Sequence, residues 1–306
     1  MTIIEKAIGR RGDEGFIVVA VLWILAALAT LASVYAIYVA NTVSAARVHD
    51  DRIQAQALVS AAVELTAYRL TAADRETRPT RGAFRFGMEG ANVAVDFRSE
   101  AARIDLNDAP KELLAGLFAA LGARAADAGY FADRIIAWRQ AVGNEASTYR
   151  TAGLSYAPRG APFAHVGELW LVLGIPPQFV ERALPYVTVF SGQPSINVLD
   201  AAPLALAALP GMTPELLNAV LTQRGAGRQN GEYVLGMLGP AQGNATLDGS
   251  KATRVRVRVA FQNGRMVDAS VVILILEDAD EPFRVLSWRN DADGPFDDEP
   301  PRAGLR

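Results

Sequence analysis

Few residues of this sequence can take part in chemistry. It contains no cysteine and only two histidines, His49 and His165, which excludes a cysteine nucleophile, a thiolate-bound metal and a multi-histidine metal site. The sequence also lacks the signatures of nucleotide-binding loops, serine hydrolases and zinc peptidases. We expect His49 on the surface of a helix and His165 as a helix cap or a core residue. The protein is therefore predicted not to be an enzyme, with a membrane-anchored hydrolase as the competing hypothesis.

An acidic run near the C-terminus offers one candidate metal site. Glu277, Asp278 and Asp280 lie close together, and Asp291 and Asp293 follow them. Calcium takes roughly six to eight oxygen ligands from a closed loop, and neither stretch has the spacing of an EF-hand loop. The simpler interpretation is a group of solvated acids. A structural calcium ion at the first three acids is the alternative, and no other cofactor is expected.

The composition is that of a chain with a sizeable core. Of the 306 residues, 51% are hydrophobic and 21% are charged, and the net charge is −3. This length corresponds to roughly two domains. Nucleic-acid binding depends mainly on basic side chains that neutralise phosphates, so the acidic balance argues against nucleic acid as a general partner.

The N-terminal region contains a long apolar segment. Phe16 to Ala40 is a run of 25 residues without a charge, and as a helix it would be about 37 Å long, enough to cross a hydrocarbon core of about 30 Å. Lys6, Arg10 and Arg11 precede it. We therefore predict a transmembrane helix, with the first 15 residues in the cytoplasm and the rest of the chain on the far side. The alternatives are a signal peptide, whose apolar region is usually shorter, and a buried core helix.

The helix is predicted to continue beyond the membrane. No glycine or proline occurs between Phe16 and Arg78, and these are the residues that usually break helices. After the span, apolar residues recur at every fourth position, at Ile53, Ala57, Ala61 and Leu65, with Val59, Val63 and Leu70 beside them. This amphipathic continuation over residues 41–78, with the helix ending near Ala73, needs a partner surface, which we expect to be a β-sheet from later in the chain.

The start of the chain resembles a class III, type IV pilin-like signal. A short basic leader from Arg10 to Gly15 precedes Phe16, which opens the apolar segment. In proteins of this class a prepilin peptidase cuts after the glycine and methylates the new N-terminus. The resemblance therefore implies a leader over residues 1–15, cleavage between Gly15 and Phe16, and N-methylation of Phe16. A small residue before the cut suits an active site that must approach the backbone closely.

Ala20 departs from the usual pilin pattern at the fifth position of the mature chain. Pilins and major pseudopilins usually have glutamate there, and in the family this carboxylate meets the N-terminal amine of a neighbouring subunit. A carboxylate inside the bilayer is costly unless it is paired. A subunit at the tip of a filament has no neighbour above it to supply the amine, so Ala20 favours a tip position. Chance substitution at a lipid-facing position is the alternative.

The rest of the chain predicts a sheet that is interrupted by helices. The expected segments are a first part of the sheet over residues 79–107, an inserted helical domain over residues 108–188, a second α+β part over residues 189–289 and a flexible acidic tail over residues 290–306. This predicts a pilin-like α+β fold, in which the long N-terminal helix packs on an antiparallel sheet and an all-α domain is inserted.

Local signals predict several further elements. Asp108 is expected to cap a helix, a glycine-rich loop is expected over residues 225–250, and the pair Asn263-Gly264 predicts a hairpin between two strands. The strand before that hairpin alternates valine with Arg254, Arg256 and Arg258. We expect these arginines on a solvated strand face, with a phosphate or carboxylate site as the alternative.

An internal repeat relates two segments that lie 92 residues apart. Residues 104–117 align without gaps with residues 196–209, and six of the 14 positions are identical. The second copy leads into residues 209–213, which resemble the turn of a helix-hairpin-helix motif. Such turns usually read Gly-x-Gly, so that backbone N–H groups can approach a phosphate, but here the second glycine is Thr213. A packing hairpin is therefore expected, with DNA binding as the competitor.

These features together resemble the minor pseudopilin K family of type II secretion systems, also called general secretion pathway protein K. The resemblance rests on the pilin-like start without glutamate, the large size, the helical block within a pilin sheet and the segment from Ile196 to Gly211. Leu199 and Ala202 replace the asparagine and proline that are more usual in that segment. The family has been associated with calcium, which is why the acidic run is kept as a candidate site.

The resemblance implies a structural role in protein export. The protein would cap the tip of the periplasmic pseudopilus and initiate its assembly, held in the inner membrane by a single span with a cytoplasmic N-terminus and a periplasmic C-terminal domain. The implied partners are the minor pseudopilins I, J and H, the inner-membrane assembly platform and the prepilin peptidase, but no nucleic acid. The alternatives are a minor pilin of a type IV pilus and a membrane-anchored helix-hairpin-helix DNA-binding protein.

Overall fold

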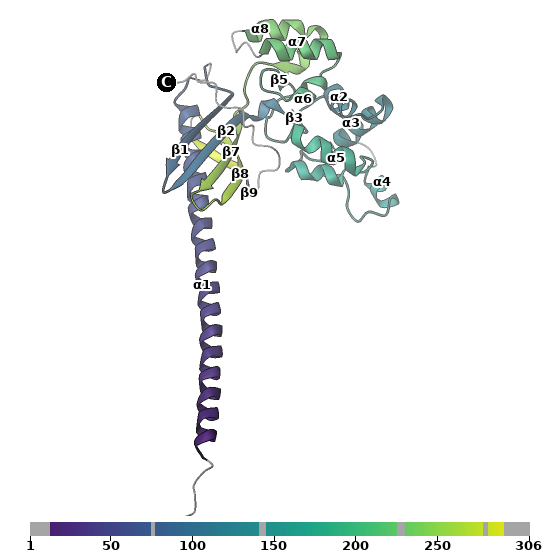
Figure 1. The fold of residues 1–306 in the computed structure, drawn as a ribbon. Coiled ribbons are helices and arrows are strands. Elements are labelled where there is room, and N and C mark those ends of the chain that lie inside the picture. The colour runs from purple at the N-terminus through teal and green to yellow at the C-terminus, as the bar shows by residue number, and fades with distance from the viewer. Residues whose placement is uncertain (1–12, 75–76, 141–144, 225–229, 278–280, 291–306) are drawn as a thin grey trace, which may run out of the picture. The chain divides into compact units, whose positions relative to one another are not determined.

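The computed structural model of the protein describes residues 13–74, 77–140, 145–224, 230–277 and 281–290. The chain divides into two compact units, Met1–Ala57 and Leu58–Arg306. The described part of the first unit is the N-terminal portion of helix α1. The second unit contains the end of α1, a five-stranded sheet and a group of shorter helices (Figure 1).

Helix α1 runs from Asp13 to Thr71, and the absence of proline and glycine from Phe16 onward predicts this long helix. It ends two residues before the expected position near Ala73. Hydroxyl groups in its apolar part donate to backbone carbonyls of the preceding turn, which removes unpaired donors from an apolar surface. These bonds join Thr30 to Ala27 (2.8 Å), Ser33 to Ala29 (2.8 Å) and Thr42 to Tyr38 (2.9 Å).

The main sheet is antiparallel throughout and has the strand order β1-β2-β7-β8-β9. Its strands are β1 (Arg81–Met88), β2 (Ala91–Ser99), β7 (Ala252–Phe261), β8 (Met266–Ile275) and β9 (Phe283–Asn290). The predicted hairpin at Asn263-Gly264 is confirmed, since it joins β7 to β8 and Gly264 has φ +82°. The sheet is thus split in sequence between β2 and β7, as expected.

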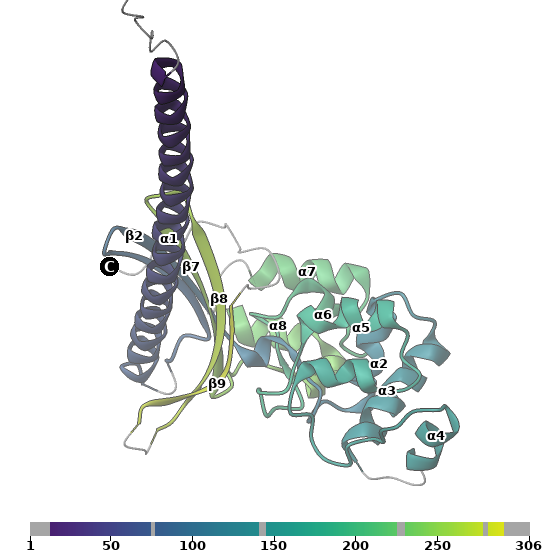
Figure 2. The ribbon, with the colours of Figure 1, turned by 90° about the horizontal axis from the view of Figure 1, so that it is seen from below.

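One face of the sheet is apolar and packs against the C-terminal turns of α1, which Figure 2 shows lying along that face. Every second residue of the strands and every third or fourth residue of the helix point into this interface. Fully burying one large apolar side chain, such as valine or leucine, stabilises the fold by about 1.5–3 kcal/mol. The core includes Leu58, Ala62, Val63 and Leu70 of α1 and Val93, Val95, Val255, Val257, Val271 and Ile273 of the sheet. The predicted partner surface, a sheet, is therefore confirmed, and Val59 and Val63 lie in the buried face as expected. The expected stripe at every fourth residue is wrong, because Ile53 and Ala57 are exposed. A spacing of four drifts around a helix of about 3.6 residues per turn.

The helices between β2 and β7 form a second core of their own, and Figure 1 shows them gathered in one group. They are α2 (Lys111–Ala120), α3 (Ala125–Arg139), α4 (Glu145–Thr151), α5 (Pro177–Ala183), α6 (Pro203–Ala207), α7 (Pro214–Arg224) and α8 (Gly231–Met237). Two short parallel strand pairs accompany them, β3 (Ile104–Asp105) with β4 (Val187–Thr188) and β5 (Ile196–Asn197) with β6 (Ala245–Thr246).

Three local expectations differ from the structure. The helical part does not end near residue 188, because α6, α7 and α8 follow and their buried residues belong to the same core as α2 and α3. The described part of the expected loop over residues 225–250 contains α8 and the 3-10 helix η5 (Gly239–Asn244). Asp108 is not a helix cap, since α2 is preceded by Pro110, which makes no side-chain capping bond.

The internal repeat is a repeat in structure as well. Each copy is a short strand followed by two helices, β3-α2-α3 in the first and β5-α6-α7 in the second. The carboxylate of Asp105 accepts the N–H of the residue two positions on, at 2.8 Å, and the side-chain oxygen of Asn197 does the same, at 2.9 Å. An arginine at the end of the second helix donates to a matching carbonyl in each copy, Arg139 to Ala109 and Arg224 to Ala201.

The two copies meet at equivalent positions. Gly116 of α2 lies directly against the backbone of Ala208, and a Cβ atom at Gly116 would be only 1.9 Å from the Ala208 carbonyl oxygen. The contact requires a residue without a side chain at this position, since the obstructing group is backbone. The glycine inside α2 is thus explained by packing rather than by a turn.

We expect Gly116→Ala to destabilise the protein by about 1–3 kcal/mol, the usual cost of overpacking. Gly129→Ala is the matched control, because Gly129 lies in α3 and has no atom within 4 Å of the added Cβ. That variant should gain roughly 0.5–1 kcal/mol from helix propensity. Urea unfolding of the full chain in detergent, followed by tryptophan fluorescence, measures both. Equal effects of the two substitutions would show that the close contact does not constrain the fold.

Candidate functional site

The predicted processing site lies at the start of α1. Gly15 and Phe16 fall within the first turns of the helix, and Ala20 follows one turn later. Within the described residues, Ile17–Val39 is the helix segment long and apolar enough to cross a membrane. The structure thus presents an uninterrupted helix after the proposed cut, while cleavage and methylation at Gly15 and Phe16 remain predictions.

The acidic run gives little support to a metal site. Asp278 and Asp280 lie outside the described residues. The carboxylate of Glu277 is paired with Arg78, with 3.0 Å between Oε1 and the guanidinium. Among the residues that the structure describes, no group of three or more histidine, aspartate or glutamate side chains is placed to hold a metal ion. The structural calcium ion at these positions remains a hypothesis.

The two histidines lie in or directly before helical segments. His49 lies within α1, as the sequence predicts. His165 precedes the 3-10 helix η2 (Val166–Leu171), and its Nδ1 atom accepts the backbone N–H of Gly167 at 2.9 Å. The prediction of a helix cap at His165 is therefore confirmed.

The face of the sheet away from α1 is rich in arginine. Pairing across the strands places Arg81 opposite Arg98 and Arg98 opposite Arg254, so three guanidinium groups form one row. The next row contains Asp96, Arg256, Ser270 and Arg289. Like charges directly opposite each other destabilise a sheet, so the arrangement requires carboxylates to compensate the positive charge.

Glu100 supplies the main compensating charge. It lies in the 3-10 helix η1 (Glu100–Ala102) just after β2, is 1% exposed, and accepts two hydrogen bonds from Arg254, at 2.7 and 3.1 Å. Thr188 donates a further bond to the same carboxylate. Burial alone would raise the pKa of Glu100, but Arg254 and Arg103 together with these hydrogen bonds lower it below its ordinary value. Glu100 is therefore charged at neutral pH.

This pair corrects the expectation for the alternating arginines. Arg254 is not on a solvated face, since its side chain is 10% exposed and belongs to a buried ion pair. Arg258 agrees better with the expected solvated strand face, because its side chain and that of its partner Asp268 are both about 30% exposed. For Arg254 the alternative prediction of a carboxylate site applies, and the carboxylate is that of Glu100 in the same chain.

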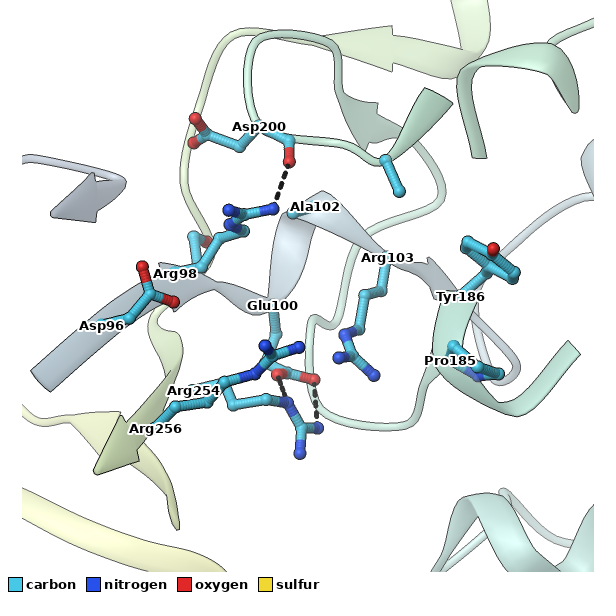
Figure 3. A pocket seen from close by; sticks show the side chains of 12 residues that line it. Asp96, Arg98, Glu100, Ala102, Arg103, Pro185, Tyr186, Asp200, Arg254 and Arg256 are labelled. Carbon is cyan, nitrogen blue, oxygen red and sulfur yellow. Dashed lines mark hydrogen bonds and ion pairs between the residues drawn. The ribbon is translucent and has the colours of Figure 1, made fainter. Parts of the chain in front are cut away.

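A second carboxylate, Asp200, compensates the first row of arginines. It lies in the loop between β5 and α6, and its Oδ1 atom is 3.3 Å from Nε of Arg81. The backbone carbonyl of Asp200 accepts a hydrogen bond from Arg98 at 3.4 Å (Figure 3). Residues of the helical part thereby hold the charged edge of the sheet.

A cavity of about 380 Å³ lies between these groups. Its lining includes Arg98, Glu100, Arg103, Pro185, Tyr186, Asp200, Arg254 and Arg256 (Figure 3). Sequence reasoning missed this site, because its residues come from β2, from the segment around β4 and β5, and from β7. The available signal was the alternation of arginine in a strand that also had to be half buried.

The turn that resembles a helix-hairpin-helix leads into α7. Gly211 has φ +76°, and the hydroxyl of Thr213 accepts the backbone N–H of Leu216 at 3.3 Å. Glu215 lies in the first turn, where its backbone N–H and the Thr213 hydroxyl lower the pKa of its carboxyl group. A hydroxyl and a carboxylate thus occupy the helix end that a DNA phosphate would need, which argues against DNA binding.

A long apolar helix whose end packs on an antiparallel sheet defines the pilin-like class of α+β proteins. A family model described as type II secretion system (T2SS), protein K, matches residues 94–192. A chain in the crystal structure of the GspK–GspI–GspJ complex from the enterotoxigenic Escherichia coli type 2 secretion system has a similar fold. The TM-score is 0.58 and the identity 17%, over 80% of this chain and 99% of that chain. A search of curated proteins finds no match.

Residues 94–192 thus match the type II secretion system protein K family, and the fold agrees with that match. Both matches support the predicted minor pseudopilin of type II secretion, which is a structural component rather than an enzyme. The apolar segment Ile17–Val39 agrees with the membrane anchor of such a protein.

Proposed function

We propose that the protein caps the tip of the periplasmic pseudopilus and initiates its assembly. The observation that supports this proposal most is the helical part between β2 and β7, which runs from α2 to η5. Tight helical stacking along a filament shaft leaves little room for an insertion of this size in every subunit, whereas an end has open space on one side. Ala20, in place of the usual glutamate, favours the same position.

Partners follow from the related complex. In the structure from enterotoxigenic Escherichia coli, GspK is in a complex with GspI and GspJ, and we propose corresponding partners for this chain. Pseudopilin H, the inner-membrane assembly platform and the prepilin peptidase complete the proposed set. The proposed topology is a single inner-membrane span with a cytoplasmic N-terminus and a periplasmic C-terminal unit, which follows from Lys6, Arg10 and Arg11 before the span. The family match favours type II secretion over a type IV pilus.

Removal of the protein tests the role in initiation. A strain that lacks it should form fewer pseudopili of ordinary or greater length, because a tip subunit starts filaments and does not extend them. Filament number and length are counted by electron microscopy after shearing. An unchanged number of shorter filaments would indicate a role in elongation and contradict the proposal.

We expect Ala20→Glu to leave secretion unchanged or mildly reduced. Without a subunit above it, the new carboxylate has no amine partner, and its insertion costs about 2.5–3.5 kcal/mol on translocon scales. The measure is the fraction of a secreted substrate found outside the cell, with Ala20→Gln as the uncharged control of the same size. If Ala20→Glu increased secretion, an amine partner would have to exist at this position, and the tip proposal would be wrong.

A further inference from the structure

Arg103 differs from the other arginines of the cavity. Within the described chain its guanidinium makes no hydrogen bond and no ion pair, and Figure 3 shows it extending into the cavity without an interaction line. Arg254, by contrast, is held by Glu100, and Arg98 donates to the carbonyl of Asp200. The guanidinium group of Arg103 therefore lies in the cavity without a hydrogen-bond partner among the described residues, next to arginines that already have one.

The electrostatic surroundings of Arg103 favour an anion. Burial and the neighbouring guanidinium of Arg254 lower the pKa of Arg103 to about 9, in spite of the attraction of Glu100. Arg256 and Arg289 add to the repulsion. An anion next to Arg103 would relieve this repulsion, because an opposite charge favours the charged form of the group.

The balance of charge in the lining indicates which anion fits. The lining holds the four arginines Arg98, Arg103, Arg254 and Arg256 and the three acids Asp96, Glu100 and Asp200. One positive charge is in excess, which matches a single carboxylate better than a doubly charged phosphate. A guanidinium fork also matches a carboxylate in geometry, since two parallel N–H groups can face its two oxygens.

We propose that this cavity is a binding site for a carboxylate, which Arg103 holds through its guanidinium. Pro185 and Tyr186 supply an apolar wall, against which the carbon atoms next to the carboxylate pack. The cavity has the volume of a small-ligand site. The ligand is either a free organic acid or an acidic side chain of a polypeptide, and both offer the same group to Arg103.

The test is the thermal unfolding of the full-length protein in uncharged detergent, followed by tryptophan fluorescence. Sodium propionate, which carries a single carboxylate, is compared with sodium chloride at equal ionic strength. In a second arm an acetylated, amidated glutamate peptide is compared with the same peptide containing glutamine. A ligand that binds the folded state raises the unfolding midpoint. We expect propionate, the glutamate peptide or both to raise it in the wild-type protein. A response to propionate alone identifies a free acid, and a response to the peptide identifies a side chain.

The variants separate binding from a structural role. In Arg103→Gln the response should disappear, with affinity at least about tenfold weaker by calorimetry. Arg103→Lys, which keeps the charge without the fork, should respond weakly and serves if Arg103→Gln does not fold. Arg124→Gln is the matched control, since Arg124 is 87% exposed and paired with Asp127, and it should respond like the wild type. No response in the wild type, or an equal response in Arg103→Gln, would overturn the proposal.

Discussion

Replacing Gly15 with leucine should abolish the mature form of the protein. The peptidase has to accommodate the residue before the cut, and a branched side chain would obstruct the close approach to the backbone that glycine allows. The uncleaved chain would keep Lys6, Arg10 and Arg11 in the cytoplasm. Drawing these charges through hydrocarbon during assembly would cost about 2.5–3.5 kcal/mol each on insertion scales, so secretion should be lost with cleavage.

Mass spectrometry of the N-terminus measures this outcome. The wild-type protein should begin with methylated Phe16, and Gly15→Leu should retain the full leader. Gly12→Leu is the matched control, because it makes the same change three residues before the cut and should leave cleavage intact. A mature chain that begins after Ala40 would identify an ordinary signal peptide and remove the pilin-like interpretation of the leader.

Breaking the Glu100–Arg254 pair should have the largest effect on stability. Glu100→Gln leaves the guanidinium of Arg254 nearly buried without its counter-charge, and removal of one partner from a buried pair costs about 3–5 kcal/mol. Asp268→Asn removes the partner of Arg258 on the same strand face, but there both groups are about 30% exposed. That control should lose less than about 1 kcal/mol. Urea unfolding at neutral pH compares the two, and equal losses would contradict the account of the pair.

The pH dependence gives a second check on the same pair. The pKa of Glu100 is lower in the folded protein than its ordinary value, so its stabilising contribution is fully present above that ordinary pKa and is lost as the pH falls through the folded pKa. The difference in stability between the wild type and Glu100→Gln should therefore shrink in acid. A difference that stays constant with pH would mean that the ionised carboxylate is not what stabilises the fold.

The long helix and the sheet could be predicted from the sequence because their signals are local. Apolar residues three or four positions apart, in a stretch without glycine or proline, predict a helix. Valine that alternates with polar residues predicts a strand with one buried face. The turn at Asn263-Gly264 depends on the same kind of local signal. These elements also determine the fold class, which is why the class was predictable.

The remaining differences come from contacts between distant residues. Helix α8 (Gly231–Met237) contains Gly236, and its sequence has little helix propensity. Its formation depends on tertiary packing, with Val234 fully buried and Gly231 against Leu247. In the same way, Glu100 and Arg254 are 154 residues apart in the chain. A single sequence shows that such an arginine needs a partner but not which acid supplies it.

The tip position is the central claim, and gold labelling of pseudopili tests it most directly. Antibodies against the helical part, applied to filaments long enough to separate their ends from the shaft, should label one end of each filament and leave the shaft bare. Labels spaced along the shaft, in numbers that grow with filament length, would contradict the claim.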